Sequence, residues 1–295
     1  MPIHQATRVD HDSGSREVAE FFGPEGMRVF GFEHLPLAGA RAGVVICSPL
    51  YAEFTRNYRR EVLIGRRLAA LGIAVQRFHY RGQGNSDGRI SDTTLSTMRD
   101  DAQAATERLI QVSGVERLAF FGTRIGGLTA AAIARAHPVA PLVLWDPVLN
   151  PSQYLGDIFR ASRIQALKQS EPGAKSGESM LAQLEHDGAF HVLGYTVTHS
   201  LYLSGQGHDL EAEVGTSPRA VLMIRLGGDP RLGRALSGII GRWRDAGLDL
   251  EIHTLNRLEP WWFTAGALIG EEALTEPIEV TVDWLTRALT LGDLS

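Results

Sequence analysis

The sequence predicts an α/β fold built around a mainly parallel β-sheet. Three observations support this prediction. Short apolar runs alternate with amphipathic helical patterns, a continuously apolar run at 42–50 indicates a strand buried on both faces, and the run at 117–122 passes directly into an alanine-rich helical pattern. Parallel strands joined by helices need right-handed crossovers, which place helices on both faces of the sheet. We therefore expect a sheet between two helical layers.

The expected elements are short apolar runs for strands and stretches with apolar residues every three or four positions for helices. A helix ending is indicated by Gly72 for the first helix and by Pro138 after the third. The predicted strands are 27–35, 42–50, 73–80, 117–122, 141–148, 219–228 and 248–256, and the predicted helices are 59–72, 93–112, 124–136, 231–246 and 274–290.

The alternation breaks between residues 150 and 216. This stretch contains helical patterns and the polar segment KQSEPGAKSGES, with no clear strand. An insertion between two strands of a sheet is most simply a cap over the strand ends. We therefore expect an α/β core from 1–149 and 217–295, with a cap or lid from 150–216.

Composition excludes several classes of protein. The 295 residues are 44% hydrophobic and 21% charged, as in an ordinary globular protein, and the net charge of −5 argues against a nucleic-acid partner. No run approaches the ~18 apolar residues of a membrane span. The polar first 25 residues lack the apolar segment of a secretion signal, and a lone cysteine, Cys47, excludes an internal disulfide. A cytoplasmic location is expected.

Metal and cofactor signatures are also missing from the sequence. The ten histidines are dispersed, and none shows the helical H-E-x-x-H spacing of a zinc enzyme. The glycines of GTRIGG and RGQGNSDG lack the companion residues of a phosphate loop or a dinucleotide site. We expect no metal and no cofactor, and a small-molecule ligand as the partner; the oligomeric state is left open.

Chemistry is expected where the parallel strands end. In an open parallel sheet, ligands bind in a crevice outside the carboxyl ends of the strands. The side chains that follow these ends form the candidate site, and most are polar or aromatic. They are Cys47, Tyr51, Glu53, His79, Thr123, Arg124, Ile125, Asp146, Asp229, Glu259, Trp261 and Trp262.

The segment Gly122-Thr123-Arg124-Ile125-Gly126 has the form of a strand, a sharp turn and a helix start. In the nucleophile elbow G-x-S-x-G, the central serine is exposed on such a turn. Here the central residue is Arg124. Arginine stays protonated at physiological pH and offers no usable lone pair, so it acts neither as nucleophile nor as general base.

Several segments together resemble the α/β-hydrolase superfamily over nearly the whole chain. They are FFGPEGMRVFGFEHLP, GVVICSPLYAEFTRNYRRE, HYRGQGNSDG, FFGTRIGGLTA, VLWDPV and VLGYTVTHSLY, and they stand in the family's order. The chain is most similar to the serine-aminopeptidase-like hydrolases and to the exosortase-system-associated hydrolases or acyltransferases. The resemblance implies an α/β-hydrolase fold with a helical cap.

The resemblance also implies a serine, an acid and a histidine in that chain order. Arg124 stands at the serine position, Glu259 falls approximately at the histidine, and Asp229 is the expected acid. A serine mechanism is therefore not expected. Because a buried cation needs a partner, we expect an Arg124–Glu259 ion pair in place of the Ser–His hydrogen bond.

Two main functions remain open at this point. In the first, Arg124 anchors an anionic or acyl-type substrate of an atypical enzyme, with Glu259, Asp229 or His79 as acid or base. In the second, the ion pair closes the old active site and the protein binds a small molecule or serves as a scaffold.

Three residues carry narrower alternatives. A thiol nucleophile at Cys47 would make the protein an acyl hydrolase or thioesterase, although a small buried hydrophobic residue is favoured there. His79 is favoured as a structural residue in its turn. The pair Trp261 and Trp262 would either line a substrate pocket or pack the last helix against the sheet.

Overall fold

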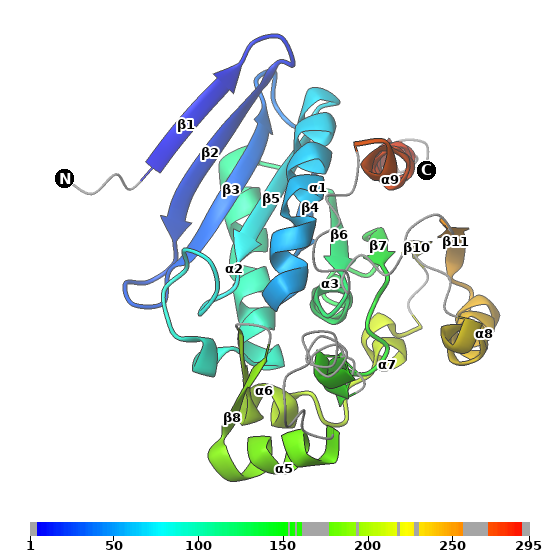
Figure 1. The fold of residues 1–295 in the computed structure, drawn as a ribbon. Coiled ribbons are helices and arrows are strands. Elements are labelled where there is room, and N and C mark those ends of the chain that lie inside the picture. The colour runs from blue at the N-terminus through cyan, green and yellow to red at the C-terminus, as the bar shows by residue number, and fades with distance from the viewer. Residues whose placement is uncertain are drawn as a thin grey trace.

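The structure is a computed structural model that describes residues 5–152, 154–156, 158–160, 177–192, 195–216, 219–226, 230–255 and 271–290. Within these residues, one sheet has the strand order β1-β2-β3-β5-β4-β6-β7-β10-β11 (Figure 1). Its strands are β1 (Gln5–Asp10), β2 (Ser15–Phe22), β3 (Val29–Pro36), β4 (Ala42–Cys47), β5 (Ile73–His79), β6 (Leu118–Thr123), β7 (Leu142–Trp145), β10 (Ala220–Arg225) and β11 (Asp249–Thr254).

The sheet is antiparallel at one end and parallel elsewhere. Strands β1, β2, β3 and β5 pair antiparallel in succession, whereas β5, β4, β6, β7, β10 and β11 pair parallel. The six parallel strands all point their carboxyl ends to one edge of the sheet. That edge is where the candidate site was expected.

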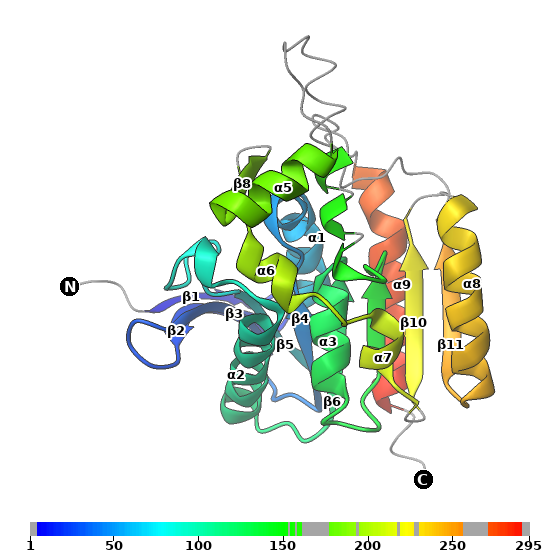
Figure 2. The ribbon, with the colours of Figure 1, turned by 90° about the horizontal axis from the view of Figure 1, so that it is seen from below.

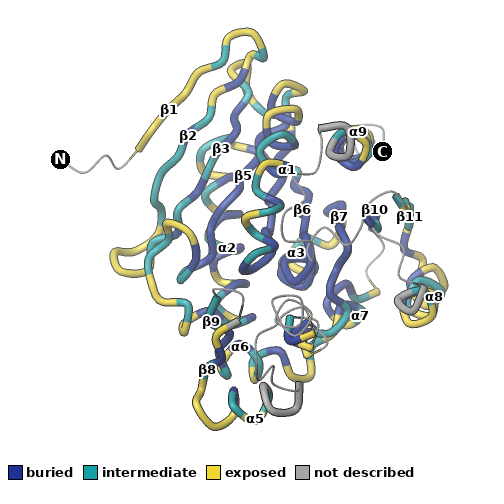
Figure 3. The backbone as a smooth tube through the Cα atoms, in the orientation of Figure 1, coloured by how far each residue is buried: buried dark blue, intermediate teal, exposed yellow. Residues whose placement is uncertain are grey.

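Helices cover both faces of the sheet, and two apolar cores result. Figure 2 shows α2, α3 and α8 in front of the strands and α9 behind them. The first core lies under α2, α3 and α8, and the second lies under α1 and α9. The central strands are buried along their length (Figure 3), as strands covered on both faces must be. These helices are α1 (Tyr51–Ala70), α2 (Leu95–Ser113), α3 (Gly126–Ala134), α8 (Pro230–Asp245) and α9 (Glu271–Thr290), with the short 3₁₀ turn η1 (Ile90–Asp92) before α2.

Most of the elements between β7 and β10 lie beyond the carboxyl ends of the strands, whereas the last helix, α7, packs beside α3 (Figure 2). They are α5 (Gly177–Asp187), β8 (Ala189–Val192), β9 (Tyr195–Thr198), α6 (His199–Ser204) and α7 (Leu210–Val214). Strands β8 and β9 form a separate two-stranded antiparallel sheet. The expectation of no strand in 150–216 was therefore wrong. The two strands are only four residues long, which is too short for a periodic pattern to show.

The α/β class with a mainly parallel sheet is confirmed, and each strand and helix predicted from the sequence is present. Besides the strands β8 and β9, two features were missed. The hairpin of β1 and β2 was not predicted, because it lies in a polar stretch with little apolar alternation and is only partly buried. Helix α1 begins at Tyr51, whereas the sequence prediction placed its start at 59. The start was missed because the first two turns carry polar residues on the buried side.

Candidate active site

The turn between β6 and α3 has the geometry of a nucleophile elbow. Arg124 lies between Thr123, the last residue of β6, and the start of α3, and its φ is 54°, in the left-handed region. The N–H of Arg124 donates to the carbonyl oxygen of Trp145 at 3.0 Å, and its own carbonyl accepts from the N–H of Gly127 at 3.0 Å. The side chain of Arg124 is thereby presented at the strand edge, where a serine would stand in G-x-S-x-G.

Two glycines allow the elbow to pack closely. A Cβ on Gly122 would lie 2.5 Å from the carbonyl oxygen of Gly126, and a Cβ on Gly126 would lie 2.2 Å from the carbonyl oxygen of Cys47. Both contacts are with backbone atoms, which cannot move aside. The spacing of four residues between the glycines therefore reflects close approach of α3 to β6 and to the end of β4.

The guanidinium of Arg124 is buried and paired. The residue is 5% exposed, its Nε donates to Oε1 of Glu53 at 3.1 Å, and its Nη1 donates to the carbonyl oxygen of Asp146 at 3.0 Å. Burial by itself lowers the pKa of Arg124, but the carboxylates of Glu53 and then Asp146 outweigh it and leave the pKa raised. Arg124 is therefore a permanent cation with a carboxylate in contact.

Glu53 comes from the first turn of α1, beside two buried tyrosines. Tyr51, at the start of α1, and Tyr154 are 7% and 1% exposed. Burial raises the pKa of Tyr51, and burial followed by the charge of Glu53 raises the pKa of Tyr154 well above its usual value. Both phenols are neutral. The ring of Tyr51 also contacts Tyr195 of β9, at 5.8 Å between centroids, so the elements beyond β7 reach the site.

Asp146 fixes the position of β7 relative to β10. Its N–H donates to the carbonyl oxygen of Ile224 at 2.8 Å, and its Oδ2 accepts from the N–H of Leu226 at 3.0 Å. The residue follows the last residue of β7 and is 8% exposed. Asp146 therefore holds the neighbouring strand ends together, and its carbonyl oxygen accepts a hydrogen bond from Arg124.

The described residues with positive φ other than glycine are Tyr51, Arg124 and Asp146, with φ of 57°, 54° and 38°. Arg124 and Asp146 directly follow the last residues of β6 and β7, and Tyr51 follows the short loop after β4. The left-handed region costs a non-glycine residue about 1–3 kcal/mol, and such residues gather at functional sites. The strain marks this edge of the sheet as the candidate site.

A buried polar network lies behind the elbow and was missed in the sequence analysis. Ser48 Oγ donates to Glu61 Oε2 at 2.7 Å, and Asn57 Nδ2 donates to Glu61 Oε1 at 2.7 Å and to Thr123 Oγ1 at 3.3 Å. Arg77 Nε lies 3.7 Å from Glu61 Oε2. Burial raises the pKa of Glu61 despite these partners. The network connects α1 to the ends of β4, β5 and β6.

A sequence signal for this network was present. Glu53, Asn57 and Glu61 stand four residues apart, which places them on one face of a helix. In the structure, that face of α1 is the buried one. Because the helix was expected to begin only at 59, the first two members fell outside it and the pattern was not recognised.

His79 lies in a box of aromatic rings below the site. Its Nδ1 accepts the N–H of Asn85 at 3.1 Å, so the proton of the neutral ring is on Nε2. The rings of Phe54 and Phe32 are 4.9 and 5.5 Å away between centroids. Burial, with a smaller contribution from Arg77, lowers the pKa of His79 to about 4. These contacts favour a structural role in the turn that follows β5.

Cys47 is fully buried at the end of β4. Burial raises the pKa of its thiol to about 12, so the thiolate needed for nucleophilic attack is scarce at neutral pH. Thr123 and Ile125, which flank Arg124, are buried as well. The thiol environment favours the small buried hydrophobic residue over the thiol nucleophile.

Four of the expected site residues lie outside the described part of the chain. They are Asp229, Glu259, Trp261 and Trp262. The expected Arg124–Glu259 ion pair therefore stays a prediction. What the structure adds is a carboxylate partner for Arg124, Glu53, that was expected only as a residue lining the crevice.

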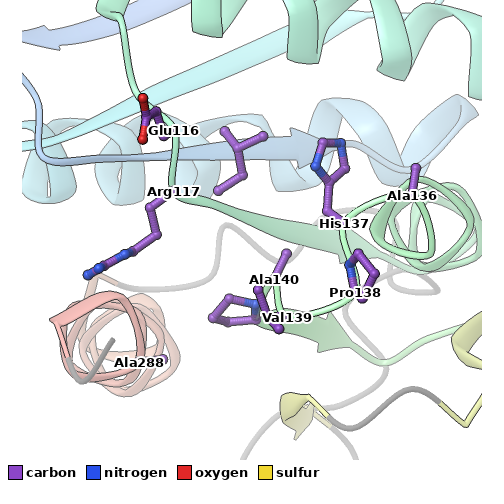
Figure 4. Close-up of a pocket in the computed structure, with 10 residues that line it drawn as sticks. Glu116, Arg117, Ala136, His137, Pro138, Val139, Ala140 and Ala288 are labelled. Atoms are coloured by element: carbon purple, nitrogen blue, oxygen red, sulfur yellow. The ribbon is translucent and has the colours of Figure 1, made fainter. Parts of the chain in front are cut away.

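Other features of the described residues lie away from the elbow. A pocket of about 630 Å³ is lined by residues before β6 and β7, among them Arg117 and His137 (Figure 4), at the opposite end of the sheet. Among the described residues, no group of three or more His, Cys, Asp and Glu could hold a metal ion. No helix in the same part of the chain is long and apolar enough to span a membrane.

Comparison with known proteins is consistent with this geometry. Residues 39–183 match the family described as "Serine aminopeptidase, S33". A stretch of 127 residues is 36% identical to an uncharacterized protein of Mycobacterium tuberculosis, and it covers 42% of this chain and 42% of that protein. The match thus spans less than half the length of this relative.

Solved structures resemble the chain over almost its whole length. Est1E from Butyrivibrio proteoclasticus has a TM-score of 0.61 at 14% identity, covering 92% of this chain and 98% of its own. A putative hydrolase from Agrobacterium vitis gives 0.61 at 16% identity, with 93% and 99% covered. The mouse alpha/beta hydrolase domain-containing protein 10 gives 0.58 at 16% identity, with 91% and 98% covered. At these identities the likeness establishes a shared fold.

Replacing Gly126 by alanine tests the close approach of the elbow to β4. We expect Gly126→Ala to lower the free energy of unfolding by about 3 kcal/mol, because the added methyl group would meet the carbonyl of Cys47. Chemical denaturation followed by circular dichroism measures it. Gly241→Ala in α8 is the matched control, since no atom lies near its added Cβ, and it should be neutral or stabilising by about 0.5–1 kcal/mol. Equal effects of the two changes would contradict the packing argument.

The pKa of His79 predicts a pH dependence of stability. Because the folded-state pKa of about 4 lies below the ordinary 6.5, the unfolded chain binds a proton first as the pH falls. Stability that is complete above pH 6.5 should decline by about 3 kcal/mol between pH 6.5 and 4 through this residue. Denaturation at several pH values should show a smaller decline for His79→Phe than for the original chain. Parallel curves for the two proteins would show that His79 is not the responsible group.

Proposed function

We propose that this chain, which has the α/β-hydrolase fold, binds a small molecule or serves as a scaffold and does not hydrolyse esters through an acyl-enzyme. The observation that carries this proposal is the Arg124–Glu53 ion pair, buried at the position of the nucleophile. The core, 1–149 and 217–295, supplies the elbow in this proposal, and the cap, 150–216, covers it.

The chemistry of arginine supports the absence of an acyl-enzyme. A nucleophile needs a lone pair that a neighbouring base can expose, and the guanidinium of Arg124 has none. The raised pKa of Arg124 removes its neutral form at any physiological pH. Cys47, the other candidate nucleophile, has a pKa raised to about 12. Neither side chain supports covalent catalysis.

The charge balance around Arg124 favours a closed site over an anion anchor. A guanidinium that binds a substrate carboxylate or phosphate needs donors directed at the substrate. Here Nε is directed at Glu53 and Nη1 at the carbonyl of Asp146. The carboxyl groups of Glu53 and Asp146 both raise the pKa of this guanidinium. A further anion would therefore approach a guanidinium whose charge is already balanced in part by carboxyl groups of the chain.

An atypical enzyme is the second candidate, and one observation favours it. Tyr51, Arg124 and Asp146 all hold left-handed backbone conformations at the same edge of the sheet. Strain of this kind is often retained where a precise arrangement of groups is used. In this alternative the pair of Arg124 and Glu53 opens for an anionic or acyl-type substrate, and Arg124 binds the negative charge that develops during reaction.

Ester hydrolysis separates these proposals from serine or thiol catalysis. We expect no turnover of p-nitrophenyl acetate above the rate in buffer, and no labelling by a fluorophosphonate probe, because neither Arg124 nor Cys47 is an activated nucleophile. Iodoacetamide should not label Cys47 in the native protein, since the thiol is buried and protonated. Mass spectrometry of the intact protein reads both labels, with urea-unfolded protein as the positive control for Cys47. Ester turnover that is lost in Cys47→Ala would establish the thiol route.

A double-mutant cycle tests whether the Arg124–Glu53 pair closes the site. Arg124→Met should lower the free energy of unfolding by about 3–5 kcal/mol, because it leaves the carboxylate of Glu53 buried without its cation. Arg124→Met combined with Glu53→Gln should cost less than the sum of the two single changes. Denaturant titration measures all four proteins.

The exposed pair Arg242–Glu211 is the matched control, and Arg242→Met should leave the free energy of unfolding nearly unchanged, because ion pairs at the surface contribute little. If the protein is instead an atypical enzyme, Arg124→Met should not lower the free energy of unfolding, since residues of active sites are commonly held at the expense of stability. A neutral or stabilising Arg124→Met would therefore reject the closed site and favour the enzyme.

A further inference from the structure

We infer that the pocket at the amino ends of β6 and β7 is a second ligand site, which takes a small uncharged aromatic molecule with one N–H or O–H donor. The pocket encloses about 630 Å³ and lies at the opposite end of the sheet from the elbow. Pockets that bind small molecules commonly measure roughly 300–1,000 Å³. Figure 4 shows that three parts of the chain line it: Arg117 directly before β6, His137 and Val139 from the loop between α3 and β7, and Ala288 from α9.

The walls of the pocket are mainly apolar. Apart from Glu116, Arg117 and His137, the lining consists of alanine, leucine, valine and proline side chains. Val139, which is part of this lining, is 86% exposed, the largest exposure of any large hydrophobic residue in the described part of the chain. Apolar side chains gathered at a hollow and left open to water are a common mark of a binding site. The body of the ligand is therefore apolar.

The loop that carries His137 is held in a fixed shape. The N–H of His137 donates to the carbonyl oxygen of Ala134 at the end of α3 at 3.0 Å, and the N–H of Ala140 donates to the carbonyl oxygen of His137 at 2.9 Å. Pro138 fixes the backbone within this turn. The ring of His137 packs against the buried ring of Phe120, 5.2 Å away between centroids. The pocket is therefore formed before a ligand arrives, which removes the free-energy cost of ordering it.

The charges of the lining favour an uncharged ligand. Glu116 and Arg117 carry opposite charges next to each other in the chain. Burial lowers the pKa of His137 below its ordinary 6.5, so its ring is neutral at pH 7. The guanidinium of Arg117 is also engaged at the end of α9, where its Nη1 donates to the carbonyl oxygen of Leu289 at 2.6 Å. An anion or a cation would therefore gain one attraction and one repulsion, with no net benefit to offset the loss of its hydration.

His137 supplies the polar contact that orients the ligand. A neutral imidazole has one nitrogen that donates and one that accepts. Within the described residues, the ring nitrogens of His137 have no hydrogen-bond partner, and burial is the sole cause of its lowered pKa. An aromatic molecule that donates one hydrogen bond satisfies the accepting nitrogen while its ring lies on the apolar walls. Indole has this chemistry, which makes it a suitable probe.

Indole and N-methylindole, which lacks the N–H, test the inference as a matched pair of probes. We expect indole to bind with a dissociation constant on the order of 100 µM. N-methylindole should bind about tenfold more weakly, because one hydrogen bond is lost. Isothermal titration calorimetry measures both constants. Amide NMR shifts should change at Val139, Ala140 and Ala288 and stay constant at the elbow.

Two variants separate the hydrogen bond from the cavity. His137→Phe keeps an aromatic ring in place, so it should weaken indole by about tenfold, to the level of N-methylindole, and leave N-methylindole unaltered. Ala288→Leu fills part of the pocket and should abolish the binding of both probes. His186→Phe is the matched control, since His186 is an exposed residue of α5, and it should change neither constant. Thermal unfolding of each variant verifies that it is folded.

Three results would overturn the inference. Equal weakening of both probes by His137→Phe would show that this residue only shapes the loop. The ligand site would be rejected if indole showed no saturable binding up to about 2 mM, or if it shifted amides at the elbow in place of those at the pocket. A dimer in sedimentation velocity that Ala288→Leu disrupts would show that a second copy of the chain covers the pocket. None of the variants touches the elbow, so the proposed function stands or falls separately.

Discussion

The buried cation at Arg124 is the constraint on which the rest of the candidate site depends. A charge removed from water must have a partner of opposite sign and satisfied hydrogen bonds, or it costs several kcal/mol. Glu53 provides the carboxylate and Asp146 provides a carbonyl. Because the first comes from α1 and the second from the end of β7, one side chain fixes three elements relative to one another.

This constraint extends into α1. The helix uses its buried face for Glu53, Asn57 and Glu61 rather than for apolar residues over its first three turns. Glu53 pairs with the charge of Arg124. Asn57 donates to Thr123 at the end of β6 and to Glu61, which in turn accepts from Ser48 after β4. Below this polar layer, Ile64 and Leu68 continue the helix into the apolar core. The polar first half of α1 therefore belongs to the site, and the apolar second half belongs to the fold.

The periodic parts of the sequence predicted the fold well, and the polar parts did not. Strands such as β4 and β6 are continuous apolar runs, because both faces are covered. Both ends of β6 were placed within one residue, and β4 was placed correctly at its start but three residues too long at its end. The elbow was identified because close packing requires glycine at 122 and 126. The partner of Arg124 was harder to identify, because it depends on where α1 begins, and polar residues obscure that start. The hairpin of β1 and β2 buries too little apolar surface to leave a periodic signal.

Position 124 holds a charged side chain although an apolar one could also fill its place in the elbow. A buried pair is seldom more stabilising than apolar residues of the same volume, so stability alone would favour an aliphatic side chain at 124. An aliphatic side chain, however, makes no hydrogen bonds and so could not orient its neighbours. The guanidinium of Arg124 places Nε toward Glu53 and Nη1 toward the carbonyl of Asp146, and both acceptors are held in turn by α1 and by β10. The pair therefore specifies how the strand ends and α1 are oriented around the elbow. A fixed orientation of this kind fits the ligand-binding or scaffold role proposed above.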